Sequence, residues 1–186
     1  MKNKKTNSIK WCEDKRACSS AIEWIKDNKI NSLEEAWGKC KRSDWMLWSL
    51  AEIDHKNDSQ LRLFACWCVR QVWHLLDDER SKNAIIVAEK YAIGKATDSE
   101  LAIATKAAAE KDVWDATRAV RAVMWAAWDA VGGTTRTARD ASWETMRAAV
   151  NVARATQDAA DVRMGITLSE QADKLREMIE NPFIGV

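Results

Sequence analysis

The sequence predicts an all-α protein: a compact N-terminal helical bundle, a long Ala-rich helical hairpin and a short C-terminal helix. The 186 residues include only six Gly and one Pro, and so few turn-forming residues exclude a sandwich or barrel of many short strands. Helix start motifs recur along the chain, and apolar residues return at helical spacing between them. We therefore expect about eight helices and no strand.

The bundle is expected over residues 8–95. Residues 1–7, MKNKKTN, form a basic start without an apolar signal region, and we expect this start to be disordered. The following 88-residue stretch supplies most of the predicted core. Its helices are expected over 9–27, 33–40, 45–53, 59–76 and 79–93.

Start and stop signals mark the ends of the helices. The capping-box pattern, a Ser or Thr three residues before a Glu, occurs at Ser32 to Glu35, Thr97 to Glu100 and Thr167 to Glu170. Single N-caps are expected at Asp44, Asp58 and Asp78. Stop signals occur at Gly94, Gly132 with Gly133, Gly165, and Asn181 with Pro182. Of these, Gly94 is expected to take the left-handed conformation that ends the helix over 79–93.

Residues 96–186 are expected to hold the hairpin and the C-terminal helix. The two long helices are predicted over 98–131 and 134–164, and each would run to roughly 45–50 Å at about 1.5 Å per residue. Such a hairpin is longer than a small domain, so it either contains kinks or packs against another chain. We therefore expect it to pack on the bundle and on other subunits of a homo-oligomer.

Charge and cysteine usage indicate the compartment and exclude some partners. Lys and Arg number 29 against 28 Asp and Glu, a net charge of +1, so neither a nucleic-acid polymer nor an anionic membrane is an expected partner. No stretch of about 18 residues is apolar and uncharged, so no membrane span is expected. The five Cys are odd in number and lie within helical patterns, which favours a reducing cytoplasm.

A stripe of alternating Trp and Arg on the first long helix is the main candidate binding surface. At about 100° per residue its members fall within about 40° of one line. They are Trp114, Arg118, Arg121, Trp125 and Trp128. A separate apolar face between Val113 and Val131 is sufficient as the core face. Guanidinium groups stack on indole rings and also pair with phosphate, so the stripe has the groups that bind a flat, anionic ligand.

The turn and the second long helix extend this candidate site. The turn joins flexible Gly backbone to hydroxyl groups and an Arg at a helix N-terminus, which is typical of an anion site. The added residues are Gly133, Thr134, Thr135, Arg136, Arg139, Trp143 and Arg147. The structural alternative is that the Gly pair only ends a helix and that the Arg side chains pair with Asp115, Asp129 and Asp140.

The remaining chemistry-bearing residues favour structural roles. Core packing is expected for Trp11, Trp24, Trp37, Trp45, Trp48, Trp67 and Trp73. Cys66 and Cys68 would diverge by about 200° on a helix and so would not share a metal. His74 has no nucleophile or carboxylate spaced to serve it on the same face. We therefore predict no catalytic residue, no metal site and no cofactor, and we do not expect an enzyme.

Several segments of the bundle resemble a known family. They include Ala17-Cys18 to Trp24, Glu35-Ala36-Trp37-Gly38-Lys39-Cys40, Asp44-Trp45-Met46-Leu47-Trp48 and Val72-Trp73-His74-Leu75-Leu76. In these segments the chain resembles the Imm-5-like group of immunity proteins of bacteria and phages. The matching positions are structural Trp and Cys, and the family has no established catalytic residues to carry over. The resemblance implies a setting of biological conflict, in which such proteins neutralise a toxin, an effector or a signal.

These observations predict a non-enzymatic anti-defence or immunity-type protein that sequesters an anionic aromatic small ligand, a nucleotide-derived immune signal. The alternative is an immunity protein that binds and inhibits a partner toxin or defence effector, because Trp and Arg are also enriched at protein interfaces. A concave site with converging Arg would favour the small ligand, and a flatter surface above about 1,000 Å² would favour the protein. The expected location is the cytoplasm of a bacterium or of a phage-infected cell.

Overall fold

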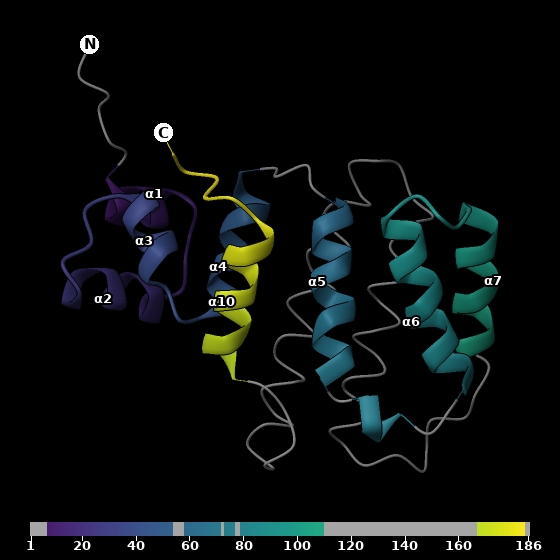
Figure 1. Ribbon diagram of the computed structural model, residues 1–186. Coiled ribbons are helices and arrows are strands. Elements are labelled where there is room, and N and C mark those ends of the chain that lie inside the picture. Colours follow the sequence, from purple (N-terminus) through teal and green to yellow (C-terminus); the bar gives the residue numbers. More distant parts are fainter. Residues whose placement is uncertain (1–6, 54–57, 72, 77–78, 110–166, 185–186) are drawn as a thin grey trace.

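The computed structural model describes residues 7–53, 58–71, 73–76, 79–109 and 167–184. Within these ranges the chain forms eight α-helices and one 3₁₀ helix, and no strand is present apart from an isolated bridge between Asn7 and Ser32. The all-α prediction is therefore confirmed. Figure 1 shows the short helices α1 to α3 at one end, α4 and α10 next to them, and then α5, α6 and α7.

The predicted helix over 9–27 is wrong, because the chain breaks there into α1 (Ser8–Asp14) and α2 (Ser19–Asp27). Arg16 takes a left-handed conformation with φ 58°, and the Ala17 N–H donates to the Cys12 carbonyl oxygen at 2.8 Å. The break lets α2 fold back, so that Cys12 of α1 and Ile25 of α2 share a small core with Ile30. A straight helix could not bury both faces in this way.

The next two helices are α3 (Leu33–Lys39) and α4 (Ser43–Glu52). The Ser32 hydroxyl accepts from the Glu35 N–H at 3.2 Å, but the Glu35 carboxylate accepts from the Asn31 N–H at 3.0 Å. Half of the predicted capping box is therefore present, with its Glu reaching one residue further back. The N-cap predicted at Asp44 is wrong: Arg42 is the N-cap, and the Asp44 carboxylate accepts two hydrogen bonds from Arg42 at 2.9 and 2.8 Å.

The following helices are α5 (Asp58–Gln71), the 3₁₀ helix η1 (Trp73–Leu75), α6 (Glu79–Ala92) and α7 (Asp98–Ala109). The helix predicted over 59–76 is therefore divided between α5 and the 3₁₀ turn, and Val72 between them lies outside the described residues. Asp58 is the first residue of α5 rather than its N-cap, and Asp78 lies outside the described residues. Gly94 has φ +70°, which confirms its predicted role after α6.

Two complete capping boxes begin α7 and α10 (Leu168–Met178), as predicted. Thr97 N–H donates to the Glu100 carboxylate at 2.7 Å, and Glu100 N–H donates to the Thr97 hydroxyl at 3.2 Å. Thr167 and Glu170 make the same pair of bonds. Each reciprocal pair satisfies two backbone N–H groups that a helix start would otherwise leave without an intrahelical partner.

The helix α10 lies against α4 and α5, far from it in sequence (Figure 1). Its Leu175 is fully buried in the main core, which also contains Leu47 of α4 and Phe64 of α5. Between the helices, the Ser43 hydroxyl donates to the buried Gln171 side chain at 2.7 Å. The predicted domain boundary near residue 95 stays a prediction, and the hairpin over 98–131 and 134–164 lies outside the described residues beyond Ala109.

Among the described helices, none combines the length and the apolar character that a membrane crossing requires.

Candidate functional site

All twelve predicted binding residues lie outside the described part of the chain. They are Trp114, Arg118, Arg121, Trp125, Trp128, Gly133, Thr134, Thr135, Arg136, Arg139, Trp143 and Arg147. The ligand-binding role of these residues stays a prediction.

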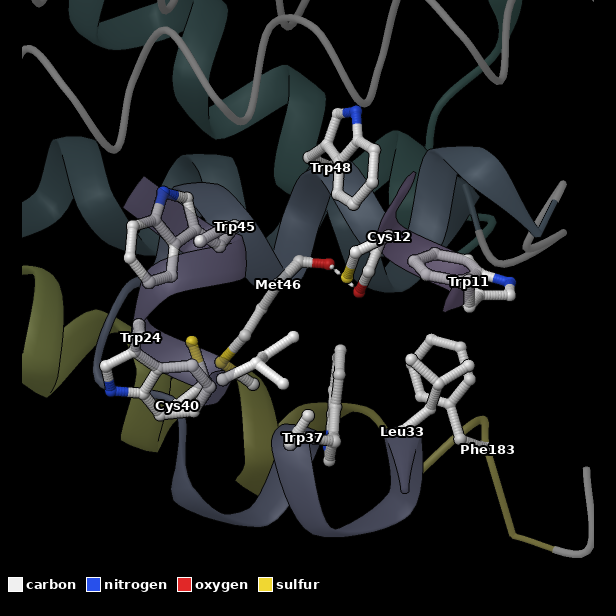
Figure 2. A pocket seen from close by; sticks show the side chains of 14 residues that line it. Trp11, Cys12, Trp24, Leu33, Trp37, Cys40, Trp45, Met46, Trp48 and Phe183 are labelled. Atoms are coloured by element: carbon white, nitrogen blue, oxygen red, sulfur yellow. Dashed lines mark hydrogen bonds between the residues drawn. The ribbon is translucent and has the colours of Figure 1, made fainter. Parts of the chain in front are cut away.

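A tryptophan-lined pocket of about 60 Å³ opens within the bundle, between α1, α2, α3, α4 and the segment after α10. Its aromatic lining is Trp11, Trp24, Trp37, Trp45, Trp48 and Phe183, which we call the Trp pocket. Figure 2 shows Trp24 and Trp45 on one side, Trp11 and Phe183 on the other, and Trp37 between them. The rest of the lining is Cys12, Ala21, Ile25, Leu33, Ala36, Cys40, Met46 and Ser49.

Helical spacing directs the Trp side chains of α4 toward this pocket. Trp45 and Trp48 are three residues apart, so they lie on one face of the helix, and Met46 on the neighbouring face enters the main core. The core packing predicted for these Trp residues is confirmed for Trp37, which is 3% exposed. Trp11, Trp24, Trp45, Trp67 and Trp73 also pack against the core, but they remain half-buried. Of these, Trp11, Trp24 and Trp45 line the pocket.

The pocket rings are held by contacts with one another. Trp11 and Trp48 form an edge-to-face pair with centroids 5.6 Å apart and planes at 73°. Trp24 and Trp45 lie 6.0 Å apart at 60°. Such pairs contribute about 0.5–1.5 kcal/mol each beyond the area they bury. The geometry therefore fixes the walls of the pocket rather than leaving the rings free to collapse into it.

Phe183 forms the remaining aromatic wall. Its ring centroid lies 5.9 Å from that of Trp11 and 6.2 Å from that of Trp37. Residues 179–184, which we call the strap, carry this ring across from the end of α10 to α3. Asn181 holds the strap, because its side-chain N–H donates to the Glu34 carbonyl oxygen at 3.0 Å while its side-chain oxygen accepts from the Phe183 N–H at 3.0 Å.

Arg176 of α10 fixes the end of α3. One of its guanidinium nitrogens donates to the carbonyl oxygens of Trp37 at 3.1 Å and Cys40 at 2.8 Å. These are carbonyl groups that the end of a helix leaves unsatisfied, and a cation there also opposes the helix dipole. Since Trp37 and Cys40 both line the pocket, α10 positions the pocket wall as well as burying core side chains.

The charge beside the pocket is neutralised. The Arg42 guanidinium lies 4.7 Å from the Trp45 ring centroid and is paired with the Asp44 carboxylate. Hydrogen bonds to Asp44 raise the pKa of Arg42 above its ordinary value. Because the Arg42 guanidinium is already paired with Asp44, the Trp45 side of the pocket favours an apolar group over an anion.

The pocket thiols are protonated and unreactive. Burial raises the pKa of Cys12 and of Cys40 to about 11. A thiol with so high a pKa forms little of the thiolate needed for nucleophilic attack. Cys66 and Cys68 are likewise buried and Cys18 is exposed, and no three His, Cys, Asp or Glu residues group as metal ligands within the described ranges.

The size and chemistry of the pocket limit what it can bind. Among the residues that line the pocket, Ser49 carries the only side-chain hydroxyl. That hydroxyl already donates a hydrogen bond to the Met46 carbonyl oxygen at 2.7 Å. A volume of about 60 Å³ exceeds that of a single water but is well below the about 150 Å³ of a cavity that binds benzene. The pocket therefore suits a small apolar group, such as the tip of an aliphatic side chain, and is too small for a nucleobase.

Sequence reasoning missed this pocket. The available signal was the density of Trp on the short helices, five within residues 11–48, which exceeds what a small core needs. Comparisons with protein-family models, with curated proteins and with solved structures gave no match. The resemblance to Imm-5-like immunity proteins therefore stays a prediction.

Proposed function

We propose that this protein is a non-enzymatic immunity-type or anti-defence protein that binds a partner toxin or defence effector, and that the Trp pocket receives an apolar side chain of that partner. The observation that carries the proposal is the pocket itself, a preformed apolar hollow walled by five Trp and one Phe. Of the two functions that the sequence predicts, protein binding is the one that this small apolar pocket supports, whereas the residues predicted to bind a nucleotide lie outside the described part of the chain.

Burial of one partner side chain supplies a useful part of the affinity. Each buried CH₂ contributes about 0.8 kcal/mol, so the tip of an aliphatic side chain with two or three carbons contributes roughly 1.5–2.5 kcal/mol, which is about a tenfold change in affinity or somewhat more. Trp residues are enriched at the centres of protein interfaces, where they exclude water around such an anchor. The five unpaired cysteines support a reducing cytoplasm as the place of action.

The test fills the pocket without disturbing the helices. Ala36 lines the pocket from α3, whereas Ala102 of α7 is exposed. Ala36→Leu and the matched control Ala102→Leu are each immobilised and challenged with an extract of cells that carry an active defence system. We expect one protein to bind the wild type and Ala102→Leu and to be lost from Ala36→Leu. Equal capture by both variants, or no specific capture by the wild type, would refute the proposal.

Sequestration of a nucleotide-type ligand is the second candidate, favoured by the alternation of Trp and Arg between Trp114 and Trp128. Native mass spectrometry of protein from challenged cells, followed by denaturation, would detect both a released nucleotide and a homo-oligomer. We expect Arg121→Ala and Trp125→Ala to lose the ligand while keeping the helical circular dichroism of the wild type. A ligand retained in both variants would remove this candidate.

A further inference from the structure

The helix α10 supports the Trp pocket from outside. Among the described residues, the lining comes from α1 to α4, from Cys40 directly after α3, and from Phe183 of the strap. The helix α10 itself packs against α4 and α5. Any influence of α10 on the hollow therefore passes through the residues that form the pocket walls.

Arg176 of α10 contacts two of these walls with one atom. Its Nη1 donates to the carbonyl oxygens of Trp37 and Cys40 at 3.1 and 2.8 Å, and it also lies 3.7 Å from the Met46 Sδ. Trp37 and Cys40 belong to the end of α3, whereas Met46 belongs to α4. All three residues line the pocket. One nitrogen atom therefore bridges two of the elements that enclose the hollow.

The guanidinium group of Arg176 is itself held in place. Its Nη2 donates to the Asp173 Oδ1, one turn earlier on α10, at 2.6 Å. The fully buried Ala172 and Leu175 fix the rotation of α10 on the main core. Because a guanidinium group is planar and rigid, bonds on both of its terminal nitrogens leave little freedom for Nη1. Arg176 thus forms a spacer of fixed length between α10, α3 and α4.

We infer that Arg176 is the positioning residue of the Trp pocket. Its guanidinium holds the end of α3 at a set distance from α4, and this distance determines the size of the partner side chain that the pocket admits. The inference rests on the proposed function, and it assigns the open volume of the pocket to one side chain that does not line it.

An apolar hollow closes unless its walls are held apart. Atoms that face an empty volume lack the dispersion contacts that close packing provides, so walls that lose a support move into the space. The contact of Trp24 with Trp45 joins α2 to α4, whereas Arg176 links the Cys40 carbonyl group to Met46. Without the donors of Arg176, we expect the end of α3 to approach α4 and the volume of about 60 Å³ to shrink.

Xenon, which enters dry apolar cavities, is the probe for the width of the pocket. The full chain is titrated with xenon, and the shifts of the assigned Trp indole N–H signals give the affinity of the folded protein. Arg176→Met removes the donors but keeps an unbranched apolar side chain. Arg70→Met is the matched control on α5, because Arg70 also makes two bonds to a carboxylate, that of Glu89, and contacts no lining residue among those described.

We expect xenon affinity to fall about three- to tenfold in Arg176→Met, the change that corresponds to hydrogen bonds of ordinary net strength. Arg70→Met should match the wild type. Arg176→Lys is the milder second variant should Arg176→Met fail to fold: it keeps the cation but replaces the planar fork by a single ammonium group. We expect its affinity to fall about twofold or more.

A merely structural role of Arg176 would lower the urea midpoint and leave the xenon affinity of the folded protein unchanged. Wild-type affinity in both Arg176 variants would therefore overturn the inference, as would tighter binding in either variant or no xenon binding by the wild type. The capture experiment with Ala36→Leu has a separate readout. Specific capture together with unchanged xenon affinity would reject the positioning role alone, and failed capture with reduced xenon affinity would reject the proposed function alone.

Discussion

Aromatic side chains are used differently in two regions of this molecule. In the region of α5, α6 and α10, cations cover the rings: Arg70 lies 3.9 Å from the Trp73 centroid, Arg62 lies 5.1 Å from Tyr91, and Lys174 lies 5.8 Å from Trp67. In the region of α1 to α4, rings contact rings and enclose the Trp pocket. Each region has one exception: Arg42 covers Trp45 of α4, and Phe64 and Trp67 of α5 stack on each other with ring centroids 6.1 Å apart.

The difference teaches how to separate a structural Trp from a binding one. A ring covered by a cation has its π face satisfied and leaves little for a partner. Rings that meet edge to face leave faces open toward a hollow, and a partner can fill it. The number of Trp residues in a segment does not distinguish the two cases, but the neighbours of each ring do.

The largest expected effect comes from removing a ring in each region. We expect Trp37→Ala to lower the free energy of unfolding by about 3–5 kcal/mol, because this ring is buried and supports Phe183. Trp73→Ala should lower the free energy of unfolding by about 2 kcal/mol less than Trp37→Ala does, since Trp73 is half-buried and covered by a flexible Arg. Urea unfolding followed by circular dichroism measures both. Equal losses would remove the distinction between the regions.

The second prediction sharpens the comparison by adding volume. Ala36→Leu places a larger side chain in the Trp pocket. We therefore expect the free energy of unfolding to stay the same or to rise by up to about 1 kcal/mol. Ala88→Leu adds the same volume to the fully buried core face of α6, and we expect a loss of about 1–3 kcal/mol. The same urea series reports both. A loss in Ala36→Leu as large as that in Ala88→Leu would show that the pocket has no room.

The third prediction concerns the two Arg residues that cover Trp rings. Arg42 is paired with Asp44, whose side chain is 5% exposed, whereas Arg70 is paired with the more accessible Glu89. We expect Arg42→Ala to lower the free energy of unfolding by about 1–3 kcal/mol, because it leaves a buried carboxylate without its partner. Arg70→Ala should cost about 1 kcal/mol or less. The reverse order, measured by thermal or urea unfolding, would contradict the assigned burial.

The smallest expected effect is a pH dependence from the pocket thiols. Burial raises the pKa of Cys40 from an ordinary value of 9.0 to about 11. The unfolded chain therefore loses this proton at lower pH than the folded one, so stability is full below the ordinary value and falls as pH rises toward the folded value. We expect the urea midpoint to fall less between about pH 8 and about pH 10.5 in Cys40→Ala than in the wild type. Parallel curves would show that Cys40 ionises freely when folded.

Local signals predicted most of the described fold. The capping boxes at Thr97 and Thr167 and the left-handed Gly94 are set by residues within a few positions of one another, so the sequence is enough to place them. The break at Arg16 was missed because a non-Gly residue there takes a left-handed conformation that only tertiary packing favours. The N-cap at Asp44 was wrong because its carboxylate pairs with Arg42 instead.

The candidate site could not be predicted in the same way. The Trp pocket combines residues from Trp11 to Phe183, and α10 positions it through Arg176. No helical periodicity relates those positions, since they meet only when five separate segments pack. The sequence did place Trp residues at core spacing, but which of them border a hollow depends on the packing itself.

Xenon binding tests the central claim, that the Trp rings of α1 to α4 enclose an open apolar pocket, most directly. Xenon enters dry apolar cavities, and assigned Trp indole N–H signals report where it goes. We predict that xenon shifts the signals of Trp11, Trp24, Trp37, Trp45 and Trp48, leaves those of Trp67 and Trp73 unchanged, and has no such effect in Ala36→Leu. Equal shifts in both sets of Trp, or none in the pocket set, would contradict the account.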